Sequence, residues 1–387
     1  MKNSYDVPMN RNRQIPISSQ RVRALLRVLF VVFSFLYFYF YQTPLLALVQ
    51  HQLSEGQTTF MPVISALVLT FVLFVVQKLV STWVHFSDAT YFFSYVPSAI
   101  LAVLLTAFTP VVSKQILIGI GVAFFCFIVA MVASFIDKTN NNHSSPSPVK
   151  LLATHCLGML GIFLFIGGMS HSNDVQTFEL ETARSLQNNS VERALHIGDE
   201  SLATSPRLVA LRAYGLSQRE GRMGDSLFVY PMAGVGAAQL LFAPDDTLSQ
   251  LLPPDSLYAK LGVWPSLQES SIAYLERMKN RSQHPMAKEY WLSGLLLEKD
   301  LKKFAQELSR YYTKVDSVDL PRFYKEALTL YNLEVEKPLT FKGDSVSADA
   351  YQKFIDKREK YDDETIRSNK LRRKYGDTYW WYYYYQN

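Results

Sequence analysis

The chain has 387 residues and a net charge of +5 at pH 7, enough length for two folding units. The first 170 residues carry ten Lys or Arg against four Asp or Glu, whereas the remainder is nearly neutral, so the positive charge does not indicate nucleic-acid binding. Both cysteines, Cys126 and Cys156, lie in apolar runs. Residues 171–387 contain no cysteine, which excludes disulfides and cysteine-based metal sites there.

Residues 1–23 form a polar, basic tail, which we expect on the cytoplasmic side. The apolar run 24–41 that follows is about long enough to cross a bilayer core of ~30 Å. A signal peptide would also begin this way, but no small-residue cleavage site follows. We therefore predict an uncleaved signal anchor.

Four further apolar segments predict a transmembrane domain over residues 24–170 with five spans. They are 62–77, 91–108, 116–136 and 151–169, and the second of them is interrupted by Pro97. With the N-terminus inside, nine Lys or Arg lie on the inner side and only Lys114 lies in an outer loop. The positive-inside rule then places the second half outside the cytoplasm. Loss of the span 91–108 would reverse this orientation.

The spans carry little chemistry, because no Asp, Glu or Lys lies between their ends. His155 is the one candidate for a proton relay, and a hydrogen-bonded structural histidine is the alternative. Small residues share a face of the fourth span and recur in the fifth. They would allow a neighbouring helix to approach closely, either from a second copy in a dimer or from the same chain. These candidate helix-packing residues are Gly119, Ala123, Cys126, Ala130, Ser134, Gly158 and Gly161.

Residues 171–387 read as an extracytoplasmic all-α domain of amphipathic helices, with no alternating strand pattern. Ser205 followed by Pro206 marks a helix start, since serine caps and proline favours the first turn. Pro285 and Pro321 mark two later starts 36 residues apart, close to the ~34-residue tetratricopeptide period. We predict tetratricopeptide-like helix pairs, with an irregular α bundle as the alternative. Such arrays offer a concave surface to a protein or peptide.

The stretch LVALRAYGLSQREGRMGD and the ending GDTYWWYYYY, together with the layout, resemble an uncharacterised family of Bacteroidota inner-membrane proteins. The resemblance implies a Gram-negative envelope with the helical domain in the periplasm. It implies no activity.

No catalytic, cofactor or metal motif occurs, because the paired-ligand spacing HExxH, a nucleophile elbow and a phosphate-binding loop are all missing. The acidic clusters Asp245–Asp246 and Asp362–Glu364 read as solvated surface. We therefore predict a non-enzymatic, membrane-anchored scaffold or adaptor whose partners are membrane lipid and an envelope protein or peptide, with no nucleic acid. The oligomeric state stays open. The alternative is a multi-spanning membrane transferase or its accessory subunit; a transporter is disfavoured by the uncharged spans.

The chain ends in seven consecutive aromatic residues, 379–385, which are costly to leave in water. They could dock on the helical domain, rest in the lipid interface or insert into a partner. The candidate docking residues are Tyr379, Trp380, Trp381, Tyr382 and Tyr383.

Overall fold

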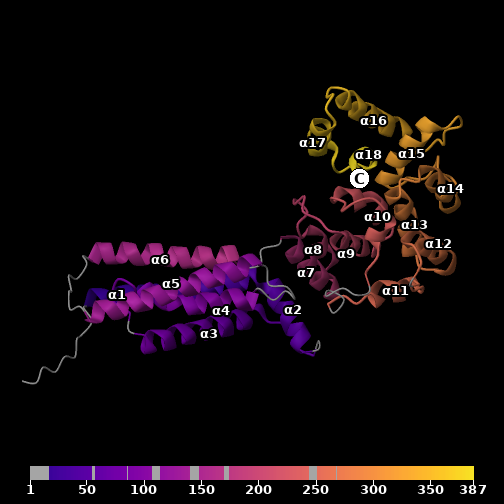
Figure 1. Ribbon diagram of the computed structural model, residues 1–387. Helices are drawn as coiled ribbons and strands as arrows, with labels where there is room; N and C mark the ends of the chain where they lie inside the picture. The colour runs from indigo at the N-terminus through magenta and orange to yellow at the C-terminus, as the bar shows by residue number, and fades with distance from the viewer. Residues whose placement is uncertain are drawn as a thin grey trace, which may run out of the picture. The chain divides into compact units, whose positions relative to one another are not determined.

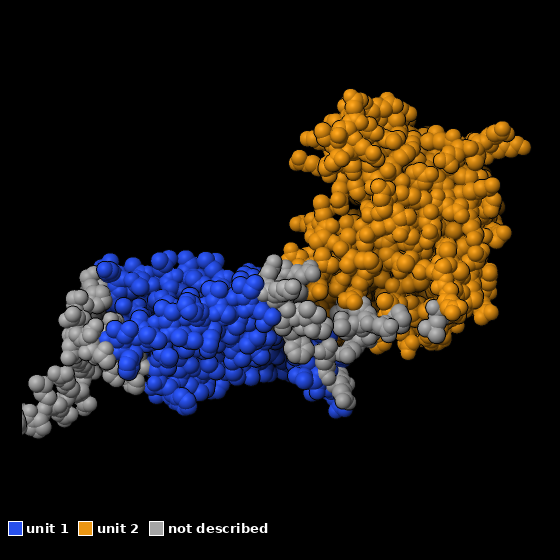
Figure 2. All heavy atoms as spheres, in the orientation of Figure 1, with its two compact units in different colours: residues 1–172 blue, residues 173–387 orange. Residues whose placement is uncertain are grey.

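A computed structural model describes residues 17–54, 57–84, 86–106, 114–139, 148–169, 174–243, 251–266 and 268–387. The chain divides into two compact units, Met1–Ser172 and Asn173–Asn387 (Figure 2). The sequence placed this boundary between residues 170 and 171. Most of the predicted basic tail lies outside the described residues.

The first unit is a bundle of helices (Figure 1). Its elements are α1 Ile17–Leu36, the π-helix η1 Tyr37–Tyr41, α2 Thr43–Leu53, α3 Pro62–Trp83, the 3₁₀ helix η2 Tyr91–Tyr95, α4 Val96–Thr106, α5 Lys114–Thr139 and α6 Pro148–Met169. Helix α1 begins at Ile17, within the predicted tail, and α2 lies between the first two predicted spans, 24–41 and 62–77. Thr43 followed by Pro44 could have signalled the start of α2, because proline suits a first helical turn.

Within the described residues, four helices are long and apolar enough to cross a membrane. They cover Ser19–Tyr41, Pro62–Trp83, Ile116–Ile136 and Val149–Met169. The remaining predicted span is a shorter apolar helix, Tyr91–Thr106, and its last two predicted residues lie outside the described part. At rises of ~2.0 Å for η2 and ~1.5 Å for α4 it measures ~26 Å.

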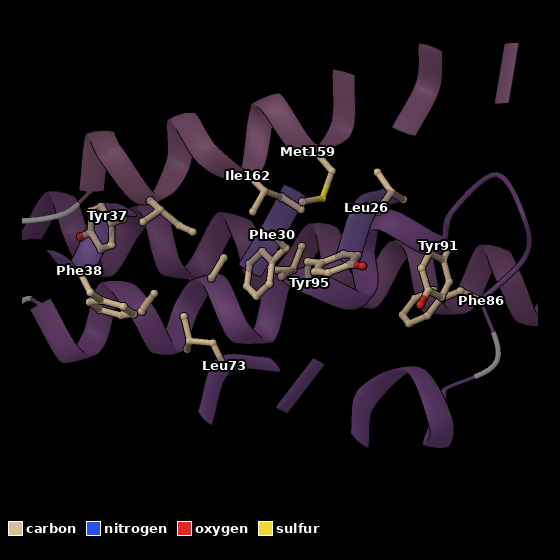
Figure 3. Packing of buried hydrophobic residues seen from close by; sticks show 14 of the residues in the cluster. Leu26, Phe30, Tyr37, Phe38, Leu73, Phe86, Tyr91, Tyr95, Met159 and Ile162 are labelled. Atoms are coloured by element: carbon tan, nitrogen blue, oxygen red, sulfur yellow. The ribbon is translucent and has the colours of Figure 1, made fainter. Parts of the chain in front are cut away.

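The core of the first unit joins α1, α3, α4 and α6 (Figure 3). Phe30 and Tyr95 lie together at its middle, with ring centroids 4.9 Å apart. Polar side chains are buried as well: Gln77 is fully buried and donates to Tyr91 Oη at 3.3 Å. Ser98 Oγ donates to the Leu73 carbonyl at 2.9 Å. The interior of this unit is therefore apolar but hydrogen-bonded.

The second unit is helical throughout its described residues, which contain no strand. Its elements are α7 Asp174–Gln187, α8 Val191–His196, α9 Pro206–Ser217, α10 Arg222–Ser226, η3 Leu227–Val229, η4 Ala237–Leu240, α11 Asp255–Leu261, α12 Ser271–Arg281, α13 Met286–Leu297, α14 Leu301–Tyr311, α15 Arg322–Glu334, α16 Asp344–Arg358, α17 Glu364–Tyr375 and α18 Tyr379–Tyr385.

Local signals account for several of these helix starts. Ser205 caps α9 by accepting from the Leu208 N–H at 3.0 Å, as predicted, and Pro206 fills the first turn. Pro285 and Pro321 directly precede α13 and α15. Consecutive helices α12 to α15 pack against one another in sequence order. These pairs are compatible with a tetratricopeptide-like array. They are equally compatible with an irregular bundle, because the lengths of the other helices vary from 5 to 15 residues.

The core of the second unit is rich in large aromatic side chains. Trp291 is fully buried, and its Nε1–H donates to Glu307 Oε2 at 3.0 Å. The same oxygen accepts from Lys279 Nζ at 2.7 Å, and both charged side chains are less than a tenth exposed. Because each buried charge faces its opposite, this pair joins α12 to α14 without leaving a charge unpaired.

Candidate functional site

The aromatic tail forms the short helix α18, which packs against α15 and α17 of its own unit. Thr378 caps this helix, with its Oγ1 accepting from the Trp381 N–H at 3.2 Å. Tyr379, Trp380, Trp381 and Tyr382 are all less than a tenth exposed. Of the three destinations considered for the tail, the structure shows docking within the chain.

Two tyrosine hydroxyls of the tail reach the end of α13. Tyr379 Oη donates to the Leu296 carbonyl at 3.0 Å, and Tyr382 Oη donates to the Leu297 carbonyl at 2.6 Å. Both carbonyls also accept a backbone N–H, Leu296 from Lys299 at 3.1 Å and Leu297 from Gly236 at 3.0 Å, so each tail hydroxyl adds a second hydrogen bond to its acceptor. Lys299 Nζ adds a bond of 2.7 Å to the Gln386 carbonyl.

Glu326 on α15 holds the start of the tail. Its Oε2 accepts from the Tyr379 N–H at 2.6 Å, and its carbonyl accepts from Trp380 Nε1 at 2.9 Å. Arg322 donates to the other carboxylate oxygen at 2.9 Å. Burial raises the pKa of the Glu326 carboxyl to about 7, against the lowering effect of Arg322.

The end of the tail is less enclosed. Tyr383, Tyr384 and Tyr385 are half-buried. Tyr384 Oη lies 2.7 Å from Tyr351 Oη. A partner at the tail would meet this edge alone, because the preceding four aromatic side chains are covered. The tail is thus mainly a structural element of the second unit.

Gly376 directly follows the last residue of α17 and lies in the turn that leads into the tail. A Cβ atom there would lie under 3.0 Å from the Arg372 carbonyl oxygen, which is backbone and cannot move aside cheaply. The Gly376 N–H donates to this same carbonyl at 2.9 Å, so the close contact belongs to the end of α17.

The small residues of the first unit divide into covered and open positions. A Cβ atom on Gly119 would lie under 3.0 Å from Met169 Sδ, and one on Gly158 under 3.0 Å from the Phe92 ring. Gly161 has no heavy atom within 4 Å of its Cβ position. Part of the predicted packing face is therefore used within the chain.

The other predicted packing residues are also placed within the first unit. Ala130 and Ser134 are buried. Ser134 Oγ lies 2.7 Å from Thr90 Oγ1. Ala123 is half-buried against the core.

His155 is buried in α6 against aromatic rings. Its ring centroid lies 6.5 Å from that of Tyr91 and 6.0 Å from that of Phe92. The Arg23 guanidinium lies over the Tyr91 ring, 4.4 Å from its centroid, and pairs with Asp88 at 2.7 Å. His155 thus belongs to a polar cluster at one end of the bundle. The sequence did not predict this cluster, because Asp88 lies in a connection between helices.

A groove of about 490 Å³ opens in the second unit, and we call it the α7–α9 groove. Its walls are mostly apolar. The lining residues are Val175, Gln176, Glu179, Ser205, Pro206, Arg207, Ala210, Leu211, Ala238, Leu241, Phe242, Ala243, Leu252 and Pro254. Four separate segments contribute, so no sequence motif could have identified it.

One edge of the α7–α9 groove is polar. Ser205 Oγ donates to Glu179 Oε1 while it also caps α9, and Arg207 Nη1 donates to Glu179 Oε2 at 3.2 Å. Glu179 is buried, whereas the Arg207 side chain is 34% exposed. The groove therefore combines an apolar floor with a fixed pair of opposite charges, a pattern typical of binding sites.

Metal-site geometry does not occur in the part of the chain that the structure describes: no three His, Cys, Asp or Glu side chains come together there as ligands.

Residues 266–386 match the model of a family of unknown function (DUF6057). The match begins before α12 and ends one residue after α18, so it contains the docked tail but not the α7–α9 groove. No curated protein and no solved structure gives a significant match.

Proposed function

We propose that the protein is a membrane-anchored adaptor of the cell envelope whose second unit binds a protein or peptide. The observation that supports it is the α7–α9 groove, with its apolar walls and its Glu179–Arg207 edge. A volume of about 490 Å³ accommodates a few side chains of an extended segment rather than a folded domain.

The partner segment that fits this groove carries apolar side chains. Leu241, Phe242 and Leu252 provide contact surface for them. The Glu179 carboxylate is already engaged by Ser205 and Arg207, so the charge that this edge presents to a partner is the exposed part of Arg207. An acidic group on the segment would face it. The helices around the groove form tetratricopeptide-like pairs in this proposal, and such arrays commonly bind peptides.

The first unit anchors the adaptor in the inner membrane of a Gram-negative envelope, with five spans, a cytoplasmic N-terminus and a periplasmic second unit. Its four long apolar helices support the anchoring role. The fifth span is the helix formed by η2 and α4. This helix is shorter than the ~30 Å hydrocarbon core, but a helix surrounded by protein does not need to match the lipid. Six of the eleven α4 residues are buried, and α4 packs against α3, α5 and α6.

A pair of arginine substitutions tests the groove. Ala243 lines it and is exposed, so Ala243→Arg should block it without disturbing the core. Ala348 on α16 is also exposed but lies outside the groove, which makes Ala348→Arg the matched control. Crosslinking in native membranes followed by mass spectrometry should give a partner that is lost in Ala243→Arg and kept in the control. Equal crosslinking of that partner by both variants would contradict the proposal.

Fusions after Ser172 test the topology. Alkaline phosphatase should be active at this point and green fluorescent protein should be dark, because only the former folds in the periplasm. The opposite pair of results would place the second unit in the cytoplasm and remove the periplasmic partner from the proposal.

A further inference from the structure

The first unit contains a second groove, between α4, α5 and α6, which we call the α5–α6 groove. It has a volume of about 660 Å³. None of the described residues that line it is charged. The lining residues are Phe92, Phe93, Val96, Ala99, Ile118, Gly119, Val122, Ala123, Cys126, Gly158, Gly161, Ile162, Phe165 and Met169.

The length of the α5–α6 groove matches half a bilayer. Along α6 its lining runs from Gly158 to Met169, the last residue of the helix. At ~1.5 Å per residue this is ~16 Å, which is about half of a ~30 Å hydrocarbon core. Gly158 lies near the middle of α6, so the groove follows one leaflet from the end of the helix to the centre of the bilayer.

The groove is closed near Gly158 and open at Gly161. The Phe92 ring occupies the space beside Gly158, where a Cβ atom would lie under 3.0 Å from it. At Gly161 no heavy atom lies within 4 Å of the Cβ position, so the helix backbone forms an uncovered floor. A chain that enters from the leaflet would lie over Gly161 and end at Phe92.

A transmembrane helix fits this groove less well than a single hydrocarbon chain. A helix with its side chains is ~10 Å wide and approaches a neighbour closely only along a continuous stripe of small residues. Here Met169 covers Gly119 and Phe92 covers Gly158, which interrupts that stripe at both ends. A flexible chain needs only the opening that remains between them.

We propose that the α5–α6 groove binds one acyl chain of a phospholipid from the leaflet that borders the C-terminal end of α6. The inference rests on α5 and α6 spanning the membrane and is independent of the adaptor role. Binding comes from shape and dispersion contacts, because the surrounding lipid is as apolar as the groove.

Photo-crosslinking of the full chain tests this site. The protein is reconstituted in vesicles of phosphatidylethanolamine and phosphatidylglycerol that contain a phosphatidylethanolamine with a diazirine in one acyl chain. Mass spectrometry then compares adducts at Cys126, which lines the groove, with adducts at Cys156, which is exposed on α6 and does not line the groove. We expect adducts to favour Cys126 over Cys156, because both carry a thiol and only Cys126 lines the groove.

Two glycines on α6 provide matched variants. Gly161→Leu places a side chain in the groove, with no heavy atom within 4 Å of its Cβ, and should lower the Cys126 adduct by about fivefold, because the acyl chain loses its contacts. Gly168 is equally open but does not line the groove, so Gly168→Leu should leave the adduct unchanged. Val122→Trp narrows the groove from α5 and should repeat the loss if Gly161→Leu does not fold.

Two results would overturn the proposal. Equal adducts at Cys126 and Cys156 that both groove-filling variants leave unchanged would show bulk lipid only. Disulfide or bismaleimide coupling of Cys126 to Cys126 of a second copy, lost in the groove-filling variants, would show that a helix of that copy occupies the groove. Either result is compatible with the fusion results expected for the proposed topology. Failure of the acyl-chain proposal can therefore be distinguished from failure of the topology.

Discussion

The two units distribute apolar and polar side chains in opposite ways. In the first unit, Leu117 and Phe125 are 59% and 66% exposed, while Gln77 and Ser98 are fully buried. In the second, Trp291 and Phe304 are fully buried, and most Lys and Glu side chains lie at the surface.

One physical rule produces both distributions. Apolar surface is stable against hydrocarbon and unstable against water, so a bundle built for lipid exposes leucine and a bundle built for water hides it. Polar side chains need hydrogen-bond partners in either case. In the first unit they find them inside, as Gln77 does with Tyr91. The contrast supports a membrane location for the first unit alone.

Removing the tail should have the largest effect on the second unit. Deletion of residues 379–387 from the isolated second unit exposes the site that four buried aromatic side chains fill, and loss of one large aromatic costs ~3–5 kcal/mol. We expect the melting temperature to fall by about 10 °C or more. Deletion of Asn387 alone is the control, and an unchanged melting temperature for the longer deletion would show that the tail does not dock.

Two exposed leucines test the contrast between the surfaces directly. Leu160 in α6 is 53% exposed and Leu333 in α15 is 63% exposed. Leu160→Asp should weaken membrane insertion by ~3 kcal/mol, because a carboxylate near the bilayer centre is costly. Leu333→Asp should change the stability of the second unit by no more than ~0.5 kcal/mol, because that position faces water. Carbonate extraction measures the first and thermal melting the second; equal tolerance of both would remove the contrast.

The pH dependence of the second unit should reflect Glu326. Burial raises the pKa of its carboxyl to about 7, so the folded state binds the proton more tightly than the unfolded chain. The stabilisation is complete below the ordinary pKa of ~4.3 and is lost as the pH rises through 7. Lowering the pH from about 8 to about 5 should therefore raise stability by up to ~3 kcal/mol.

Glu326→Gln provides the comparison for that measurement. Burial also raises the pKa of Glu289, so the wild-type pH profile contains more than one group. The difference between wild type and Glu326→Gln isolates Glu326, and parallel melting profiles would contradict its raised pKa.

Two glycine substitutions in the first unit should have the smallest effects, and of opposite sign. Gly158→Ala places a Cβ atom under 3.0 Å from the Phe92 ring and should destabilise the bundle by ~1–3 kcal/mol. Gly121 has no heavy atom within 4 Å, so Gly121→Ala should stabilise α5 by up to ~1 kcal/mol through helix propensity. Thermal unfolding of the full chain in detergent measures both. A stabilising Gly158→Ala would show that Phe92 does not pack there.

The sequence by itself determined the features that depend on local chemistry. Long apolar runs identified the four helices that could cross a membrane, and amphipathic periodicity identified the all-α class of the second unit. Ser205 and Pro206 marked a helix start because capping involves residues only three apart.

Tertiary structure alone decided the features that depend on residues far apart in the chain. The tail had three possible destinations until the Leu296 and Leu297 carbonyls and the Glu326 carboxylate, 53 to 85 positions away, proved to be its partners. The helix of η2 and α4 is buried among α3, α5 and α6, and these contacts are not encoded in its own residues. Both grooves combine several segments, and a cavity is set by how helices pack, since each helix alone specifies only its own faces.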